Sequence, residues 1–413
     1  MELSYILLSV VCVMFAVISY NFYKRLWNPV LICSGMLWLS STLACMEDAG
    51  KAKMSNALFW IVCGTITLNL SFMFSQTMVA PRIQKKNNNV VYKKHFLRTG
   101  STLCCLFAAL AAILSLYEVL QISHGFWNIF YNSTWVRMQY LERSSSKFFS
   151  LVGVFVSMNF YVLFMILPYA VKAKCPFAKI KLLFVVACRL FSSLITMSKE
   201  AFIIDIVILI TAFVSTLRNS HEEFVFFRRY AAIFAGAIAG LLAVVAFQRN
   251  YIGGGRYSNY FEAICGTLYE YIGCPITGFS ELILYQSKYY MGQQCFRPFF
   301  NILSYVGIVK RISIVQDAVI GTINVYSIFG NMFNDFSFFG IILISMIIGL
   351  LMGALYQKWN KKISGITINA ILIMTMFFSY YDYKLMQTVY VFTMVYAVLF
   401  EKIFYRKIYD NKG

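Results

Sequence analysis

The sequence predicts an all-α polytopic membrane protein with about 11 transmembrane helices and one large extracytoplasmic loop. Apolar residues make up 60% of the 413 residues, charged residues only 13%, and the mean hydropathy is +0.68. Because a soluble domain carries about 25% charged residues, this chain has too few of them to cover a globule in water. Apolar runs recur along the chain, and the basic residues lie in alternate connectors between these runs.

Each apolar run is long enough for a helix that crosses the hydrocarbon core, which takes roughly 20 residues. One set of connectors holds about three times as many basic residues as the short connectors of the other set, and such connectors stay in the cytoplasm. This bias predicts a periplasmic N-terminus and a cytoplasmic C-terminus, in agreement with an odd number of spans. The first run lacks a basic start and a cleavage site, so we expect a retained span rather than a signal peptide. The predicted spans are 3–23, 27–46, 56–80, 101–121, 149–171, 182–198, 201–217, 231–247, 337–357, 365–381 and 388–404.

One long polar segment divides the chain. Residues 1–247 hold transmembrane helices 1–8 of the prediction, 248–336 form the long periplasmic loop, and 337–413 hold helices 9–11. The loop interleaves Tyr, Phe, Gly and Arg, so we expect it to fold as amphipathic helices against the membrane surface. All three parts belong to one integral membrane domain.

Several functional classes are disfavoured by composition. The net charge of +19 does not indicate a nucleic-acid partner, because most Lys and Arg lie in the short connectors between spans, as the positive-inside rule predicts for a membrane protein. No metal-ligand spacing, nucleotide loop or hydrolase motif is present, so we expect neither a metal nor a cofactor. The 11 Cys lie mostly in apolar runs and indicate buried small side chains. One bridge among Cys265, Cys274 and Cys295 is compatible with the pattern.

Charged residues within or beside the spans are candidates for function, because a charge in hydrocarbon is costly. Arg189 lies inside the span 182–198 and is either a structural partner of Asp205 or an anion-binding cation. Lys199 and Glu200 belong to the tight outer hairpin that follows this span. We expect Lys199 to face the extracytoplasmic surface.

The long loop begins with Gln248-Arg-Asn-Tyr-Ile-Gly-Gly-Gly-Arg, so Arg249 and Arg256 flank three glycines at the membrane border. Glycine lets backbone amides approach an anion closely, which favours an anion site here over a simple hinge. The run is not a nucleotide-binding loop, because no Gly-Lys-Ser/Thr follows it.

The loop ends in a run of aromatic and amide residues that leads directly into the span 337–357. Rings that stack on the apolar face of a sugar, with amides and a carboxylate that bind its hydroxyls, suit a glycan ligand. An interfacial aromatic belt with Asp335 as a helix cap is the alternative. Asp382, in the last outer connector, either joins this site or pairs with Lys384. The polar members of the run are Asn324, Tyr326, Asn331, Asn334 and Asp335.

These segments resemble those of the bacterial oligosaccharide repeat-unit polymerases, the Wzy-type O-antigen and capsule polymerases. The hairpin Ile195-Thr-Met-Ser-Lys-Glu-Ala-Phe stands where the family has a Thr-Gly-Ser-Arg-like turn, and an arginine-rich start to a long loop is also shared. Asn324-Val-Tyr-Ser-Ile-Phe-Gly, with Asp335-Phe and Gly340 after it, is similar to the family's Thr-Asn-Val-Tyr-Thr…Asp-Phe-Gly segment. The hairpin departs from the pattern at Met197 and Lys199, so its charge is kept while the bidentate arginine fork is lost.

The resemblance implies a GT-C-like glycosyltransferase of the bacterial inner membrane. It would polymerise undecaprenyl-diphosphate-linked oligosaccharide repeat units into O-antigen or capsular polysaccharide on the periplasmic face, without a metal or cofactor. Its partners would be these lipid-linked oligosaccharides, the lipid bilayer, a chain-length regulator and a flippase.

The same resemblance suggests roles for the candidate residues. Cations would stabilise the charge of the diphosphates, and a carboxylate, Asp335 or Glu200, would deprotonate the attacking hydroxyl. The alternatives are an O-antigen ligase-like glycosyltransferase and a flippase or transporter for lipid-linked oligosaccharide. Polar residues that gather at one face favour an enzyme over a transporter. The expected catalytic residues are Arg249, Arg256 and Asp335, and the expected substrate-binding residues are Arg189, Lys199, Glu200, Asn324, Tyr326, Asn331 and Asp382.

Overall fold

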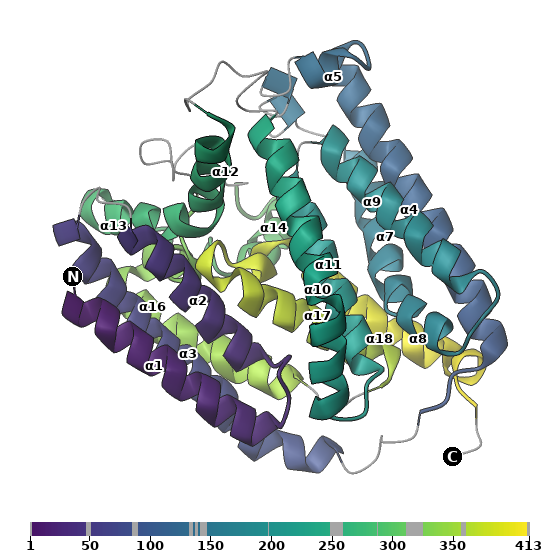
Figure 1. Ribbon diagram of the computed structural model, residues 1–413, viewed down its shortest axis with the longest axis horizontal. Coiled ribbons are helices and arrows are strands. Elements are labelled where there is room, and N and C mark those ends of the chain that lie inside the picture. The colour runs from purple at the N-terminus through teal and green to yellow at the C-terminus, as the bar shows by residue number, and fades with distance from the viewer. Residues whose placement is uncertain are drawn as a thin grey trace.

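The computed structural model has the all-α architecture of a polytopic membrane protein (Figure 1). Among the residues that it describes there is no β-strand, and Tyr92 and Tyr409 form an isolated antiparallel bridge. The described residues are 2–46, 51–84, 90–131, 135–136, 139–140, 147–196, 198–247, 259–286, 288–310, 325–356 and 361–410. Their helices are α1 (Glu2–Tyr23), α2 (Pro29–Met46), α3 (Lys51–Gln84), α4 (Lys94–Ser123), α5 (Asn128–Tyr131), α7 (Lys147–Phe164), α8 (Leu167–Lys172), α9 (Ala178–Ile195), α10 (Lys199–Ser215), α11 (Ser220–Phe247), α12 (Tyr260–Leu268), α13 (Cys274–Tyr285), α14 (Arg297–Tyr305), α16 (Ile328–Leu355), α17 (Ile363–Phe377) and α18 (Thr388–Ile408).

Within this described part, 8 helical segments are long and apolar enough to cross a membrane. Three predicted spans form α9, α10 and α11 but are not among these segments, so the predicted number of about 11 spans is not confirmed. For two of the three helices, α9 and α10, a physical reason explains why they are not among the 8 segments. α9 carries Lys179, Lys181 and Arg189, and the 17 residues of α10 reach only ~26 Å across a hydrocarbon core of ~30 Å. The 8 segments are Leu3–Tyr23, Pro29–Met46, Met54–Met78, Lys94–Ser123, Leu151–Lys172, Ile328–Leu355, Ile363–Tyr380 and Thr388–Ile408.

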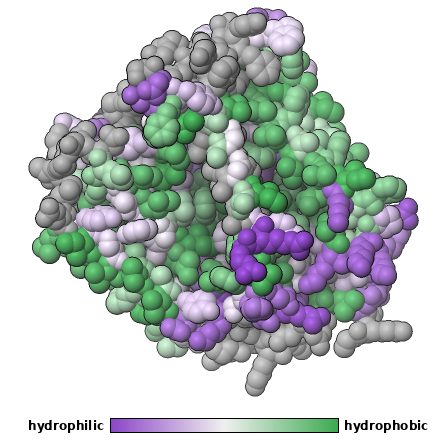
Figure 2. Space-filling view, viewed as in Figure 1, coloured by the Kyte–Doolittle hydropathy of each residue, from purple (hydrophilic) through white to green (hydrophobic). Residues whose placement is uncertain are grey.

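The outer helices present apolar faces to the surroundings. Along α1, five aliphatic side chains spaced three or four residues apart are 56–81% exposed, a stripe that a bilayer solvates and water does not. Apolar residues also cover much of the face seen in Figure 2, where hydrophilic residues gather over the ends of α8, α10 and α11. The five residues of the α1 stripe are Leu3, Ile6, Val10, Val13 and Val17.

α17 occupies the centre of the helix bundle. It packs against α2, α7, α10 and α18, and 83% of its apolar segment is buried, compared with 22% for α4. Buried polar groups on α17, such as Thr367 and Thr375, donate their hydroxyls to the carbonyls four residues earlier. This pairing satisfies them inside the bundle.

Small residues bring α3 and α16 into close contact. A side chain at Gly349 would place its Cβ 2.6 Å from the carbonyl oxygen of Leu68, and one at Gly353 would reach 2.4 Å from that of Phe72. This G-x-x-x-G spacing puts both glycines on one face of α16, where they let the two backbones approach.

The helices run between two ends of the bundle. At the first, which we name the basic end, three backbone carbonyls accept hydrogen bonds from other connectors. The carbonyl of Ile408 accepts the N–H of Lys93 (2.9 Å), that of Lys361 accepts the Tyr92 hydroxyl, and that of Thr216 accepts the ammonium group of Lys172. The connectors predicted to share the basic side therefore lie together. At the opposite end, named the loop end, lie the α9–α10 hairpin, the start of α16 and the turn between α17 and α18.

Candidate functional site

α16 is broken near its start, and its first residues fold back into the bundle. Phe336 (φ −143°, ψ 26°) and Ser337 (φ 59°, ψ −153°) leave the helical region. The Oγ of Ser345 consequently lies 3.1 Å from the Sδ of Met332, 13 residues earlier, whereas a continuous helix would separate them by about 20 Å. The span predicted at 337–357 corresponds to the second half of α16.

The first half, residues 328–335, is named here the returning half-helix, and all eight of its residues are buried. Glycines make its position possible. A Cβ at Gly340 would lie 2.3 Å from the carbonyl oxygen of Met332, and one at Gly64 of α3 would lie 2.4 Å from the ring of Phe329. A larger residue at either glycine would push the half-helix out of the bundle.

Asp335 ties the returning half-helix to the long loop. Its Oδ1 accepts the backbone N–H of Gln294 (2.9 Å), its Oδ2 accepts that of Cys295 (2.7 Å), and its carbonyl accepts that of Met291 (3.1 Å). Hydrogen bonds to an ionised acceptor are the stronger kind, so this carboxylate holds the loop against α16. Its residue is fully buried, and its role as a proton acceptor stays a prediction.

Lys384 is the centre of a polar network at the loop end. Its Nζ lies 2.5 Å from Oε1 of Glu200 and 3.2 Å from Oδ2 of Asp382. The other oxygen of Asp382 accepts the side-chain amide of Asn331 at 2.7 Å and the backbone N–H of Tyr383 at 2.7 Å. The network thus joins three segments that are far apart in sequence: the α9–α10 hairpin, the returning half-helix and the turn before α18.

The electrostatics of this network are asymmetric. The side chain of Lys384 is 1% exposed, whereas those of Glu200 and Asp382 are 27% and 20% exposed. Burial lowers the pKa of Lys384, but the adjacent Asp382 and Glu200 carboxylates raise it by more than burial lowers it. Its pKa therefore lies above the ordinary lysine value. The rings of Phe378 and Tyr381, 5.4 and 5.1 Å from Nζ, add cation–π contacts. Two carboxylates around one ammonium leave one negative charge in excess, and the carboxylates are more exposed than the ammonium group.

Arg189 has the structural partner that the sequence offered as one alternative. Its Nε donates to Oδ2 of Asp205 at 2.6 Å, between α9 and α10, and its guanidinium lies 4.8 Å from the ring centroid of Phe160. Both side chains are largely buried, at 15% and 5% exposure. A paired and stacked arginine between two helices serves first to hold them together.

The remaining predicted residues divide into two groups. Tyr326 is buried directly before the returning half-helix, near the other members of its motif. Arg249, Arg256 and Asn324 lie outside the described residues, and of Lys199 the structure describes only its place at the start of α10. The structure therefore brings together Glu200, Asn331 and Asp382, and leaves the expected anion site at the start of the loop a prediction.

Lys384 is the functional candidate that sequence reasoning underrated, since it figured only as a possible partner of Asp382 within one turn. The signal was its position, a basic residue in a connector on the side that is otherwise poor in them. Gln294 was missed altogether. Its side-chain oxygen and nitrogen are both buried and have no hydrogen-bond partner among the described residues, beside the carboxylate of Asp335.

No group of three His, Cys, Asp or Glu side chains suited to a metal ion occurs in the described ranges. All 11 cysteines are free thiols, including Cys265, Cys274 and Cys295. Comparison of the chain with protein-family models, with curated proteins and with solved structures finds no match.

Proposed function

We propose that this protein is a membrane-embedded glycosyltransferase that joins undecaprenyl-diphosphate-linked oligosaccharide repeat units into a polysaccharide. One observation carries the proposal. Three of the four segments singled out in the sequence, represented by Glu200, Asn331 and Asp382, meet in one network at the loop end. An enzyme on lipid-linked substrates needs such a polar site at the end of a membrane bundle, next to the lipid carrier. The proposed topology has 11 spans, with this end in the periplasm.

Glu200 is the proton acceptor in this proposal. Its carboxylate is held at one oxygen by Lys384 and is partly exposed, so it can reach a hydroxyl outside the network. The acceptor sugar oxygen forms a bond to the anomeric carbon of the donor glycan, and the bond from that carbon to the diphosphate oxygen breaks. The proton passes to Glu200, and the electron pair leaves with the undecaprenyl diphosphate.

The leaving diphosphate requires cations that the network itself does not offer, because Lys384 is buried between two carboxylates. Arg249, Arg256 and Lys199 fill this role in the proposal, since charge that develops on a leaving group is stabilised by preorganised cations. Asn331 and Tyr326 belong to the segment that would bind the sugars. Asp335 contributes by holding the loop in place.

The test is polymerisation in vitro by the purified full-length protein, with undecaprenyl-diphosphate-linked repeat units as substrate. We expect the wild type to form chains of two or more repeats, and Glu200→Gln to lower the rate about 100-fold, since general base catalysis typically contributes 10²–10⁴. Arg249→Ala and Arg256→Ala should each lower it strongly. Arg228→Ala, at an exposed position of α11 towards the basic end, is the matched control and should keep full activity.

Two results would contradict the proposal. If Arg249→Ala and Arg256→Ala both keep the wild-type rate, the anion site at the loop border is wrong. If the wild type transfers glycan only to a lipid A core acceptor, the protein is a ligase rather than a polymerase. Gels of surface glycan from a deletion strain separate a transporter from both: loss of a polymerase leaves single repeat units on the core, and loss of a flippase leaves none.

A further inference from the structure

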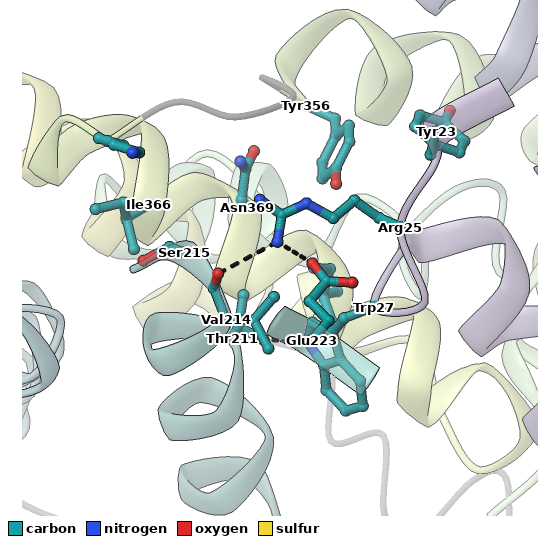
Figure 3. A pocket seen from close by; sticks show the side chains of 12 residues that line it. Tyr23, Arg25, Trp27, Thr211, Val214, Ser215, Glu223, Tyr356, Ile366 and Asn369 are labelled. Atoms are coloured by element: carbon teal, nitrogen blue, oxygen red, sulfur yellow. Dashed lines mark hydrogen bonds and ion pairs between the residues drawn. The ribbon is translucent and has the colours of Figure 1, made fainter. Parts of the chain in front are cut away.

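A pocket of about 50 Å³ opens at the basic end, at the opposite end of the bundle from the proposed active site. Its walls come from the connector between α1 and α2, from α10 and α11, from the end of α16 and from the start of α17 (Figure 3). A water molecule needs ~10–15 Å³, so the pocket admits a compact polar group.

One wall of the pocket is a closed ion pair. The Nη1 of Arg25 donates hydrogen bonds to the Glu223 carboxylate and to the carbonyl of Val214 (3.5 Å), and its Nη2 donates one to the carbonyl of Leu217 (3.2 Å), as Figure 3 shows in part. Glu223 is fully buried, and its second oxygen accepts the N–H of Leu26 at 2.9 Å. The charges of this pair cancel, so this wall is neutral.

Lys361 also lines the pocket, and it is a cation that takes no part in the Arg25–Glu223 ion pair. Its ammonium group forms no hydrogen bond or ion pair with any residue in the described part of the chain. Its burial, together with the charges of Lys172, Arg218 and Arg25, lowers its pKa, and Glu222 offsets this only in part. With the charge of Arg25 offset by Glu223, Lys361, Lys172 and Arg218 still outnumber Glu222. Positive charge is therefore in excess here, and a bound anion would relieve the repulsion.

We propose that this pocket binds a phosphate group, with Lys361 as the principal cation and with Tyr356 and Asn369 on the adjoining walls. Lysine is a common phosphate ligand as a point charge, and a phenol hydroxyl and an amide supply further donors. The pocket continues into apolar side chains, Ile366 and Ile373, and holds Trp27, a residue type typical of the membrane interface. This mixture suits the headgroup phosphate of an anionic phospholipid, and free inorganic phosphate shares the same chemistry.

This site is independent of the proposed glycosyl transfer, and binding measurements on the full-length protein test it. The probes are phosphatidylglycerol, phosphatidylcholine and inorganic phosphate, and bound lipid is quantified by native mass spectrometry of protein in mixed detergent micelles. We expect Lys361→Gln to bind phosphatidylglycerol about tenfold more weakly than wild type, because one charged hydrogen bond is lost. Lys361→Arg should restore most of the binding. Lys362→Gln is the matched control, since the neighbouring Lys362 lies 4.0 Å from Glu401 and does not line the pocket.

Each outcome decides something. Competition by millimolar inorganic phosphate would identify the ligand as a free compact anion, and its absence would identify the lipid headgroup. Equal binding of phosphatidylglycerol by wild type and by Lys361→Gln, with no binding of inorganic phosphate, would overturn the proposal. Equal binding of phosphatidylglycerol and phosphatidylcholine would show that the phosphate they share, rather than the net charge of the lipid, is bound. Equal weakening by Lys361→Gln and Lys362→Gln would overturn it too, because the effect would then reflect net charge alone. Size-exclusion profiles that match wild type show that a variant is folded.

Discussion

We expect the ion network at Lys384 to respond very differently to loss of its cation and to loss of its anions. Lys384→Met removes the ammonium group and retains a side chain of similar length against Phe378 and Tyr381. The two carboxylates that remain are 27% and 20% exposed and can turn towards water. The double variant Glu200→Gln/Asp382→Asn instead leaves an ammonium group with 1% exposure and no counter-charge.

The magnitudes follow from this difference in exposure. Exposed pairs contribute ~0–1 kcal/mol, and an uncompensated buried charge costs ~3–5 kcal/mol. We therefore expect Lys384→Met to lower the free energy of unfolding by about 1–2 kcal/mol and the double variant to lower it by about 3–5 kcal/mol. Because the pKa of Lys384 is raised in the folded protein, its contribution is complete below the ordinary lysine pKa of ~10.4 and is lost as pH rises above it.

Equilibrium unfolding of the purified full-length protein in sodium dodecyl sulfate measures these values, at neutral pH and again above pH ~10.4. Wild-type stability should fall at the alkaline pH, and that part of the fall due to Lys384 should be missing in Lys384→Met. The reasoning is refuted if the double variant loses no more stability than Lys384→Met, because burial of the ammonium group would then not control the cost.

Three further substitutions test the packing and the polar anchors. Gly353→Leu should separate α3 from α16 and cost about 1–3 kcal/mol or more, since its Cβ would lie 2.4 Å from a carbonyl oxygen of α3; Gly153→Leu, at a position with nothing within 4 Å, should be tolerated in the same unfolding assay. Glu223→Gln should cost about 3 kcal/mol by leaving the buried guanidinium of Arg25 without its counter-charge, while Glu222→Gln, at a partly exposed position, should cost under ~1 kcal/mol; similar losses in both would contradict the buried-pair assignment. Asp335→Asn should cost about 1–3 kcal/mol and speed proteolysis of the loop near residue 294, because an amide NH₂ would face a backbone N–H; an unchanged cleavage rate would show that the loop is held by other contacts.

Hydropathy located most of the long helices closely because it depends only on local composition. The predicted span 3–23 corresponds to α1 at Glu2–Tyr23, and the predicted 388–404 to α18 at Thr388–Ile408. The grouping of the basic connectors at one end was also predictable, since connectors rich in Lys and Arg stay on the same side of a membrane. The number of spans was less predictable, because α9 and α10 combine marginal length with buried charges that a partner helix compensates.

The path of the returning half-helix could not be predicted from the local sequence. The sequence predicted aromatic and amide residues before the span at 337, and the break at Phe336 and Ser337 does fall there. Nothing in the run itself shows that residues 328–335 turn back into the bundle. That path depends on Gly64, which lies in another helix and admits the ring of Phe329.

The sequence by itself predicted a membrane protein, the alternation of its basic connectors, and the segments around Glu200, Arg249, Asn331 and Asp382 as those that hold polar side chains beside the spans. Each of these follows from the cost of placing a given side chain in hydrocarbon or in water, which is a property of the residue and its neighbours in the chain. Only the tertiary structure decided that Lys384 joins Glu200 to Asp382 and that Arg189 is paired with Asp205. These pairings bring together groups from separate helices, and whether a buried charge is stabilised depends on the partner that packing places within reach.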